Sequence, residues 1–374
     1  MIIPILDLKS QYSKIKEEID SAIMEVVHEA CFINGKQVGL FEKGLAALTG
    51  SANVIACANG TDALQIAMMA LGLAPGDEVI VPSFTYAATA EVVGLLGLTP
   101  VLVDIDPLTF NIRAEDIAKS VTERTKAVVP VHLFGQVCDM ENVEKAAARF
   151  SLHIIEDNAQ AIGAYYICSD GVRKASGTMG TIGCTSFFPT KNLGCYGDGG
   201  AIFTQSDSLA ARIRMITDHG QKVKYLHDII GVNSRLDTIQ AAVLNVKLKH
   251  LQEYSSSRYA FAQRYKELLS GMDEITLPFE SPSSTHVYHQ FTIRAKRRDE
   301  LKEYLASKGI ASMIYYPLPM HRQNAFIPIS KIRVSLQESE KAAAEVLSLP
   351  MHTELNDKIQ QQVCNAIKDF FSKK

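Results

Sequence analysis

With 374 residues, 47% of them hydrophobic and 21% charged, the chain has the composition of a globular protein with enough apolar surface for two packed lobes. A formal net charge of -3 provides no basic stripe to neutralise a phosphate backbone, which argues against nucleic acid and for small substrates. Seven dispersed cysteines, with no C-x-x-C pair, indicate neither a metal site nor a disulfide framework.

The chain begins MIIPILDLKSQYSKIKEEID, where only a few apolar residues precede an aspartate and a lysine, too short a run for a signal peptide. No stretch of about 18 apolar residues occurs in the sequence. The odd number of cysteines favours a reducing compartment. We therefore expect a cytoplasmic protein with no membrane partner.

Residues 54 to 204 alternate short β-rich runs with segments of helical period, which predicts an α/β fold with a mostly parallel sheet covered by helices. The β-rich runs are NVIACANG, DEVIVPSF, PVLVDID, AVVPVHLFG and LHIIED. In such a sheet ligands bind beyond the carboxyl ends of the strands. Polar residues that follow these runs are therefore the site candidates.

The pattern after residue 204 is mostly helical, through a long segment that could link a first lobe to a second. The last hundred residues combine strand and helix patterns and predict a small α/β lobe. We expect a large domain over 1–250, including an N-terminal helical segment, and a small C-terminal domain over 251–374.

Two of the site candidates are a glycine turn and a carboxylate. In ANGTDAL, Gly60 and Thr61 lead from strand to helix, where backbone N–H groups could bind a phosphate. Capping by Thr61 or Asp62 would explain the same turn without a ligand.

In IIEDNAQAIGA, Glu156 and Asp157 end an apolar strand, where an unpaired carboxylate is costly to bury. One of these carboxylates could pair with a cationic ligand or with an arginine, or it could cap a nearby loop.

The other two candidates are a lysine and a polar helix start. SFFPTKNLGCYGDGGAIF places Lys191 five residues after Ser186 and before a glycine-rich loop, with two phenylalanines expected to fix the strand end. A solvated loop lysine is the alternative there. GVNSRLDTIQAA places Asn233 before a helix, where Asn233 or Ser234 could simply act as the cap.

Together these groups suit one ligand. A carboxylate suits a protonated aromatic ring nitrogen, a glycine turn with hydroxyl groups suits a phosphate, and a lysine suits an aldehyde. Pyridoxal 5'-phosphate carries all three chemical groups, and it passes through a pyridoxamine 5'-phosphate form when it carries an amino group.

The chain resembles the DegT/DnrJ/EryC1/StrS family of sugar aminotransferases over nearly its whole length. The matching motifs, in order, are PILDLKSQY, FINGKQVGLFE, CANGTDAL, GDEVIVPSFTYAATAE, PVLVDID, PVHLFGQ, IIEDNAQAIGA, SFFPTKNLGCYGDGGAI, HGQ, GVNSRLDTIQAA, YYPLPMH and LSLPMH. The resemblance implies an aspartate-aminotransferase-like fold (PLP fold type I), with a large domain and a small C-terminal α/β domain.

The resemblance also implies roles for individual residues. Lys191 would join the cofactor's aldehyde and then move the proton between carbon atoms, and Asp157 would hold the ring nitrogen. Tyr86 matches the position stacked on the ring, and Gln160 would lie near its phenolic oxygen.

The phosphate would be bound by Gly60, Thr61 and Ser186. Asn233 would come from the partner subunit to complete that phosphate site, which implies a homodimer with shared active sites.

Among the family's branches, the motifs look most like those of enzymes that aminate C3 of a UDP-linked 2-acetamido-3-oxo-glucuronate, with L-glutamate as donor, for surface polysaccharide, lipopolysaccharide or O-antigen synthesis. Residues of the matching motifs could contact the sugar nucleotide, although as sequence features alone they fit packed or hydrogen-bonded residues better. They are His219, Arg235, Tyr315, Tyr316 and His321.

Several rival functions remain. The chain could aminate C3 or C4 of a dTDP- or GDP-linked keto-deoxysugar, or it could be a non-catalytic regulatory protein that keeps the cofactor pocket. A dehydratase of the same fold would hold histidine at the position of Lys191, and the lysine argues against it. A plain α/β enzyme without the cofactor is the remaining alternative.

Overall fold

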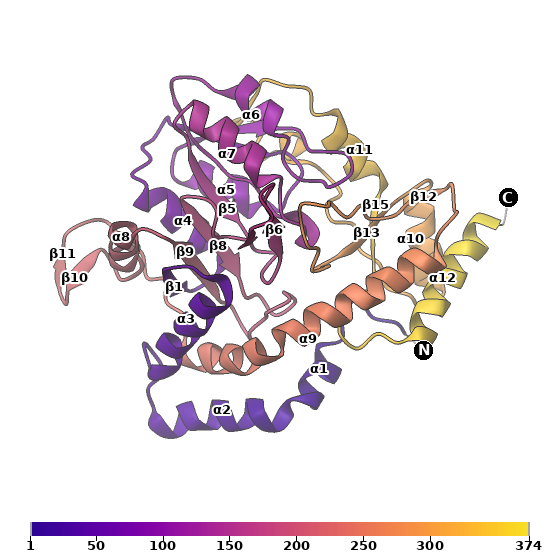
Figure 1. The fold of residues 1–374 in the computed structure, drawn as a ribbon, viewed down its shortest axis with the longest axis horizontal. Helices are drawn as coiled ribbons and strands as arrows, with labels where there is room; N and C mark the ends of the chain where they lie inside the picture. The colour runs from indigo at the N-terminus through magenta and orange to yellow at the C-terminus, as the bar shows by residue number, and fades with distance from the viewer. Residues whose placement is uncertain (1, 373–374) are drawn as a thin grey trace.

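The computed structural model describes residues 2–372, and an eight-stranded mixed sheet forms its centre (Figure 1). In spatial order the strands are β1 (Asn53–Cys57), β9 (Gly200–Thr204), β8 (Ile182–Ser186), β5 (His153–Asp157), β4 (Thr125–Val128), β2 (Glu78–Pro82), β3 (Thr99–Val103) and β14 (Lys331–Ile332). The strand β9 runs in the opposite direction to the other seven strands. The predicted α/β fold with a mostly parallel sheet is confirmed.

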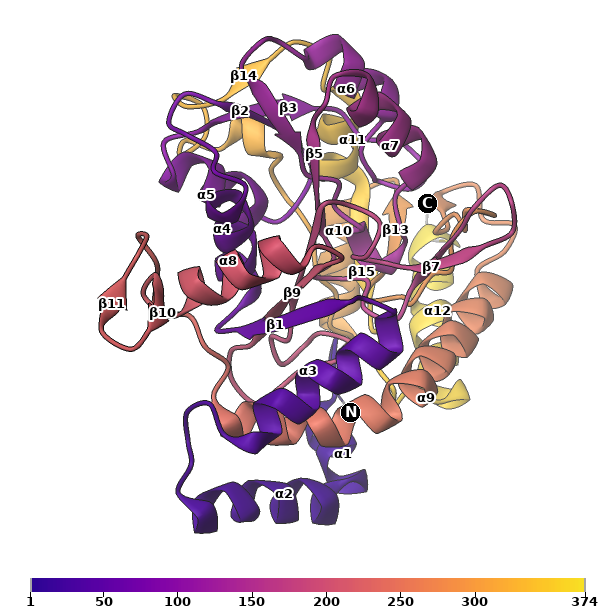
Figure 2. The same ribbon diagram turned by 60° about the vertical axis from the view of Figure 1, so that its left-hand side comes forward.

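Helices cover both faces of this sheet because successive strand side chains point to opposite sides (Figure 2). Val79 and Val81 pack in one core with α4 (Gly60–Ala70), α5 (Ala88–Leu95) and α8 (Asp207–Thr217). Ile80, between them, packs on the other side with α6 (Ala114–Ser120) and α7 (Met140–Arg149). The strands are apolar on both faces for this reason.

The longest helix, α9 (Thr238–Leu268), joins the two parts of the chain. Its first half packs with α3 (Lys36–Thr49) and with α2 (Lys16–Glu29), which follows α1 (Leu8–Lys14). Its second half packs in the C-terminal core. The predicted domain division between residues 250 and 251 falls inside α9 and stays a prediction. Within residues 2–372 we find no helix long and apolar enough to cross a membrane.

The C-terminal part has its own three-stranded antiparallel sheet, which confirms the small sheet expected there. Its strands are β12 (Ile275–Thr276), β13 (Phe291–Ala295) and β15 (Val346–Leu349), and its helices are α10 (Arg298–Ser307), α11 (Gln337–Glu345) and α12 (Asp357–Ser372). The short strand β14 belongs to the C-terminal part in sequence, but it pairs with β3 at the edge of the large sheet.

Smaller elements complete the described chain. Two hairpins, β6 (Tyr165–Ile167) with β7 (Arg173–Ala175) and β10 (Gln221–Val223) with β11 (Leu226–His227), project from the large part, and two 3₁₀ turns are η1 (Leu133–Gly135) and η2 (Met320–Arg322). The turn η1 follows β4 and reaches the carboxyl edge of the sheet, where the candidate site lies.

Candidate active site

A cavity of about 680 Å³ lies at the carboxyl ends of the parallel strands and gathers most of the predicted site residues. Those that line it are Gly60, Thr61, Tyr86, Asp157, Gln160, Ser186, Lys191, Tyr315 and Tyr316. They come from loops far apart in sequence, which the sheet brings to one edge. Among the described residues we find no His, Cys, Asp and Glu cluster that could hold a metal ion.

One end of the cavity is formed by the start of helix α4. The side chain of Asn59 caps this helix by accepting a hydrogen bond from the backbone N–H of Asp62 (2.8 Å), so neither Thr61 nor Asp62 is the cap. A Cβ atom on Gly60 would lie 2.7 Å from the Cβ of Ser186, so only glycine lets this helix end approach the serine hydroxyl so closely. The N–H groups of the first turn and this hydroxyl form a cradle suited to a phosphate.

Two neighbouring carboxylates at the end of β5 have opposite environments. Glu156 points away from the cavity, where it bonds His132 Nε2 (2.8 Å) and accepts hydrogen bonds from backbone N–H groups, among them that of Gly177 (2.8 Å). Asp157 points into the cavity and is only 6% exposed. The alternation of side chains along a strand explains why only the second carboxylate is available to a ligand.

Asp157 is held by neutral donors alone. The Thr89 hydroxyl donates to Oδ2 (2.8 Å) and the backbone N–H of Ala159 donates to Oδ1 (3.1 Å). None of the lysine, arginine or histidine side chains in residues 2–372 forms an ion pair with it. A buried carboxylate without a cation fits a protonated ring nitrogen of a ligand. Thr89 is not among the residues predicted from the sequence, although it lies four positions after Thr85 in SFTYAATAE.

Lys191 lies in a turn just after β8, where its backbone N–H bonds the carbonyl of Phe188 (2.8 Å). Burial lowers the pKa of its ammonium group to about 8, an effect that the negative charge of Asp157 partly opposes. Of the expected pair of anchoring phenylalanines, only Phe187 is buried, and Phe188 is 49% exposed in the cavity wall. Their side chains lie on opposite faces because they are consecutive in an extended chain.

The glycine-rich loop after Lys191 is hydrogen-bonded to helix α9. The buried Lys247 side chain donates to the carbonyl of Gly194 (2.8 Å), and Gln240 accepts from the backbone N–H of Tyr196 (2.8 Å). A Cβ on Gly194 would lie 2.4 Å from the carbonyl oxygen of Pro189, so the chain folds back on itself too closely for another residue. The loop is therefore a fixed support for the lysine.

Aromatic side chains form another part of the cavity wall. Gln160 donates to the hydroxyl of Tyr316 (3.0 Å) and accepts from the backbone N–H of Phe134 (2.7 Å), which locks its amide orientation. Burial raises the pKa of Tyr316. Tyr86 is 59% exposed, and its ring centroid lies 6.1 Å from that of Tyr316. Two tyrosine rings therefore line the cavity together with Asp157.

Four predicted residues do not line this cavity. His321 is bonded to Ser83 Oγ (2.7 Å) and to Glu340 (3.1 Å), Arg235 pairs with Asp218 (3.1 Å) beside another cavity, and His219 and Asn233 are exposed. A single chain therefore does not bring them to the site.

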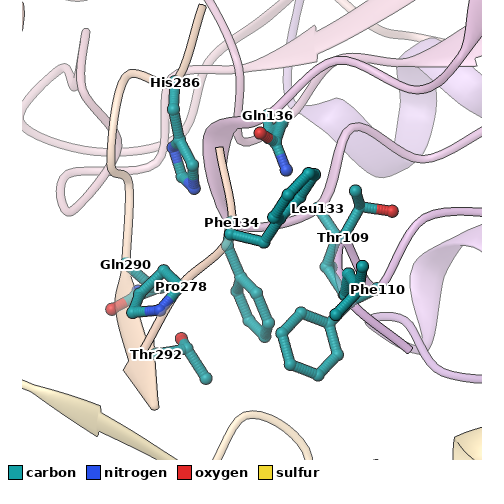
Figure 3. Close-up of a pocket in the computed structure, with 11 residues that line it drawn as sticks. Thr109, Phe110, Leu133, Phe134, Gln136, Pro278, His286, Gln290 and Thr292 are labelled. Atoms are coloured by element: carbon teal, nitrogen blue, oxygen red, sulfur yellow. The ribbon is translucent and has the colours of Figure 1, made fainter. Parts of the chain in front are cut away.

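A second, smaller cavity adjoins the first, and Figure 3 shows residues that line it. Phe134 and Gln290 line both cavities, so they form the partition between them. The side chains of His286 and Phe110 approach this smaller space from different segments. It contains none of the predicted site residues.

Comparison with known proteins identifies the family. The family model described as "DegT/DnrJ/EryC1/StrS aminotransferase family" matches residues 13–368. The chain is 48% identical to the pleiotropic regulatory protein of Geobacillus stearothermophilus, covering 99% of both chains. It is 44% identical to the UDP-2-acetamido-2-deoxy-3-oxo-D-glucuronate aminotransferase of Pseudomonas aeruginosa, covering 98% of this chain and 99% of that one.

Solved structures show the same fold. A DegT/DnrJ/EryC1/StrS aminotransferase from Brucella abortus, 42% identical, superimposes with a TM-score of 0.94 over 99% of this chain and 100% of that one. The structure of NtdA from Bacillus subtilis, 32% identical with a TM-score of 0.87 over 96% of this chain and 82% of that one, has bound cofactor PMP. Pyridoxal phosphate is the cofactor of this family, and the helix cradle, the buried Asp157 and Lys191 fit its three groups. The chain belongs to the DegT/DnrJ/EryC1/StrS family of sugar aminotransferases.

Proposed function

We propose that this protein moves an amino group from L-glutamate to the keto group of a nucleotide-linked sugar, at C3 of a UDP-linked 3-oxo sugar, for surface polysaccharide synthesis. The proposal rests on one observation: Lys191, Asp157 and the N-terminus of α4 with Ser186 line the same cavity. The name of the 44% identical relative from Pseudomonas aeruginosa supports the choice of sugar.

Each residue of the site would have a defined task. Bound pyridoxal phosphate would supply an aldehyde that condenses with amines and a ring that accepts an electron pair. The N–H groups of Gly60 and Thr61 and the Ser186 hydroxyl would bind its phosphate, and Asp157 would keep a proton on its ring nitrogen. Lys191 Nζ would accept a proton from the donor's Cα and return one to the sugar carbon.

The lowered pKa of Lys191 is consistent with this task. An amine whose pKa is about 8 is deprotonated far more often at neutral pH than an ordinary lysine, whose pKa is 10.5. The burial that produces this shift therefore also produces a competent base.

A substrate screen tests the function and separates it from its rivals. L-Glutamate should convert the protein's cofactor absorbance to that of the amine form, and a UDP-linked 3-oxo sugar should reverse the change. If only dTDP- or GDP-linked keto sugars reverse the change, the protein is the alternative C3 or C4 aminotransferase and does not act on a UDP-linked sugar. A cofactor-loaded protein without a glutamate response would instead be the non-catalytic regulatory protein that the name of the 48% identical relative suggests.

We also propose that the active form is a homodimer. The surface around Asn233 is rich in exposed apolar side chains, an arrangement that a monomer rarely presents to water. These side chains are Phe32, Ile33, Leu40, Val223, Tyr225, Leu226 and Ile230. Phe32 and Ile33 adjoin the start of α9, through the bond from Thr238 N–H to Phe32 O and the bridge between Ile33 and Asp237. A second copy seated here would carry Asn233 to its partner's cavity.

Mixing two inactive variants tests the shared site. Lys191→Ala and Asn233→Ala should each have low activity alone. If Asn233 serves the partner's cavity, a mixed dimer contains one site with both native residues, so remixing after mild denaturation should restore about a quarter of wild-type activity. No restoration, with mixed dimers shown by mass spectrometry, would mean that Asn233 acts within its own chain, and full activity of Asn233→Ala alone would mean that it has no role.

A further inference from the structure

Residues 314–320, the tyrosine strap, cross from the C-terminal sheet to the carboxyl edge of the large sheet. Before the strap, Met313 pairs with Ser348 of β15 through backbone hydrogen bonds of 2.7 and 3.1 Å. At its end, the backbone N–H of Met320 donates to the carbonyl of Ser83 (2.8 Å), directly after β2. Between these two attachments, no backbone N–H of the strap donates a hydrogen bond to another residue in 2–372. The path of the strap therefore depends on how its ends are held.

His321, the residue after the strap, adds a second attachment at this end. Its Nδ1 atom is bonded to the Ser83 hydroxyl (2.7 Å) and its Nε2 atom to a carboxylate oxygen of Glu340 (3.1 Å). A carboxylate only accepts hydrogen bonds, so Nε2 carries a proton, and in the neutral ring Nδ1 accepts from the serine hydroxyl. Both ring nitrogens are thus used in bonds within the protein, and the side chain is only 7% exposed.

The two partners of His321 belong to elements that the large sheet holds in place. Ser83 is fully buried at the end of β2. Glu340 lies in α11, and the start of this helix is bound to the end of β3, because the backbone N–H of Ser339 donates to the carboxylate of Asp104 (2.8 Å). The imidazole therefore bridges two fixed elements, and the end of the strap is attached to both.

The strap carries two tyrosines into the wall of the candidate active site. Tyr315 and Tyr316 line the cavity, and the Tyr316 hydroxyl accepts from Gln160 (3.0 Å). The strap sequence IYYPLPM has no charged residue, so it offers no cation to the two carboxylates of glutamate. Tyrosines instead suit a sugar ring, which presents apolar faces and hydroxyl groups. The strap therefore fits the sugar substrate better than the amino donor.

We propose that His321 is a positioning residue: by bridging Ser83 and Glu340, it fixes the tyrosine strap in the shape that binds the nucleotide-linked sugar. It acts through Tyr315 and Tyr316 and does not touch the substrate itself. The inference rests on the proposed function, and it replaces the direct sugar contact that the family resemblance suggests for His321.

Loss of this bridge should affect one half of the reaction. Asp157, Lys191 and the start of α4, which suit the cofactor, lie outside the strap. We therefore expect the affinity for a nucleotide-linked sugar to fall about five- to tenfold, as the loss of the net contribution of one hydrogen bond predicts. The half-reaction with glutamate should keep the rate of the wild type.

The first measurement follows the strap itself and needs no substrate. The backbone N–H of Met320 is bonded to the carbonyl of Ser83, and the residue is buried, so its exchange with deuterium in the full-length protein reports on this attachment. His321→Phe keeps a ring and loses both bonds, whereas Ser83→Ala loses only the hydroxyl. In both variants, mass spectrometry of the peptide that contains Met320 should show faster exchange of its slow amide.

The second measurement compares the two half-reactions in cofactor-loaded protein. Calorimetry gives the Kd of UDP-N-acetylglucosamine, dTDP-glucose and GDP-mannose, and the variants are compared with the sugar that the wild type binds most tightly. Stopped-flow absorbance gives the rate of the reaction with glutamate. His321→Phe and Ser83→Ala should raise the Kd and keep the glutamate rate. The double variant should resemble His321→Phe, because both changes remove the same bridge.

Arg322→Ala is the matched control. Arg322 donates to the same carboxylate of Glu340 through Nε (2.9 Å), but its side chain is 60% exposed. If the bridge through His321 is what fixes the strap, this variant should keep the exchange rate at Met320 and the Kd of the wild type.

Unchanged exchange at Met320 in folded Ser83→Ala would refute the bridge, and this result decides the question even if His321→Phe fails to fold. Faster exchange with an unchanged Kd, an equal slowing of the glutamate reaction, or equal effects in Arg322→Ala would refute the role in sugar binding. Failure of the proposed function would appear in the wild type itself, as no response to glutamate, and is therefore distinct from these differences between variants and wild type.

Discussion

Replacing Lys191 by alanine is expected to reduce turnover by at least about 1,000-fold while the protein still folds and binds its cofactor. Lys191 is the sole lysine among the described residues that line the cavity, so no other lysine amine is placed to accept the substrate proton. Borohydride reduction of the wild-type protein with its cofactor should attach the label to the peptide that contains residue 191. The same treatment of Lys191→Ala should leave that peptide unlabelled.

The chain offers a matched control for this result. Lys247 is also a buried lysine whose pKa is lowered by burial to about 8, but it lies behind the loop and outside the cavity. Lys247→Met should keep the label on Lys191, with a cost mainly in thermal stability because the loop loses its bond at Gly194. Labelling of another lysine in the wild type, or normal turnover of Lys191→Ala, would contradict the assignment.

The candidate residues that follow strands could be predicted because their positions depend on local sequence. An apolar run that ends in Asp157 or leads to Lys191 identifies a strand end, and parallel strands bring such ends to one edge. The same reasoning located Gly60 at the start of a helix. It did not identify Asn59 as the cap, because several residue types in one turn can accept the same backbone hydrogen bond.

Other parts of the site depend on contacts between distant segments. Thr89 bonds Asp157 across 68 positions of sequence, and His289 reaches the cavity only because Asn192, Gly135 and Arg258 hold its segment there. Nothing in the local sequence marks these residues, since threonine and histidine are common in strands and helix starts. Such partners become visible only when the packing is known.

Two residues whose roles come from the family resemblance, Arg235 for the sugar substrate and Asn233 for the cofactor phosphate, illustrate a third limit. Arg235 is paired with Asp218 on a surface away from the cavity, and Asn233 is exposed beside it. Their place in a complete site would depend on a second copy of the chain. Family resemblance suggested their roles, whereas the fold of one chain leaves those roles as predictions for the mixing experiment.

Asp157→Asn is expected to lower turnover by at least about 100-fold, because a neutral amide cannot stabilise a positive charge on the ring nitrogen of the cofactor. The substitution is almost isosteric: the amide oxygen can take the place of Oδ1 and accept from the backbone N–H of Ala159, while the amide NH2 in the place of Oδ2 can donate to the Thr89 hydroxyl. Single-turnover measurements with glutamate, together with the cofactor content of the purified variant, separate lost chemistry from lost binding. Borohydride should still label Lys191, since the aldehyde and the amine are both present.

The neighbouring carboxylate provides the control for this substitution. Glu156→Gln removes a negative charge one residue away, but Glu156 points to the other side of β5 and bonds His132 and backbone N–H groups. It should therefore lower the melting temperature, because a buried polar network loses its charged acceptor, while cofactor-bound protein retains the glutamate reaction. Full turnover in Asp157→Asn, or an equal loss in folded Glu156→Gln, would show that the cavity-facing charge of Asp157 is not what the reaction requires.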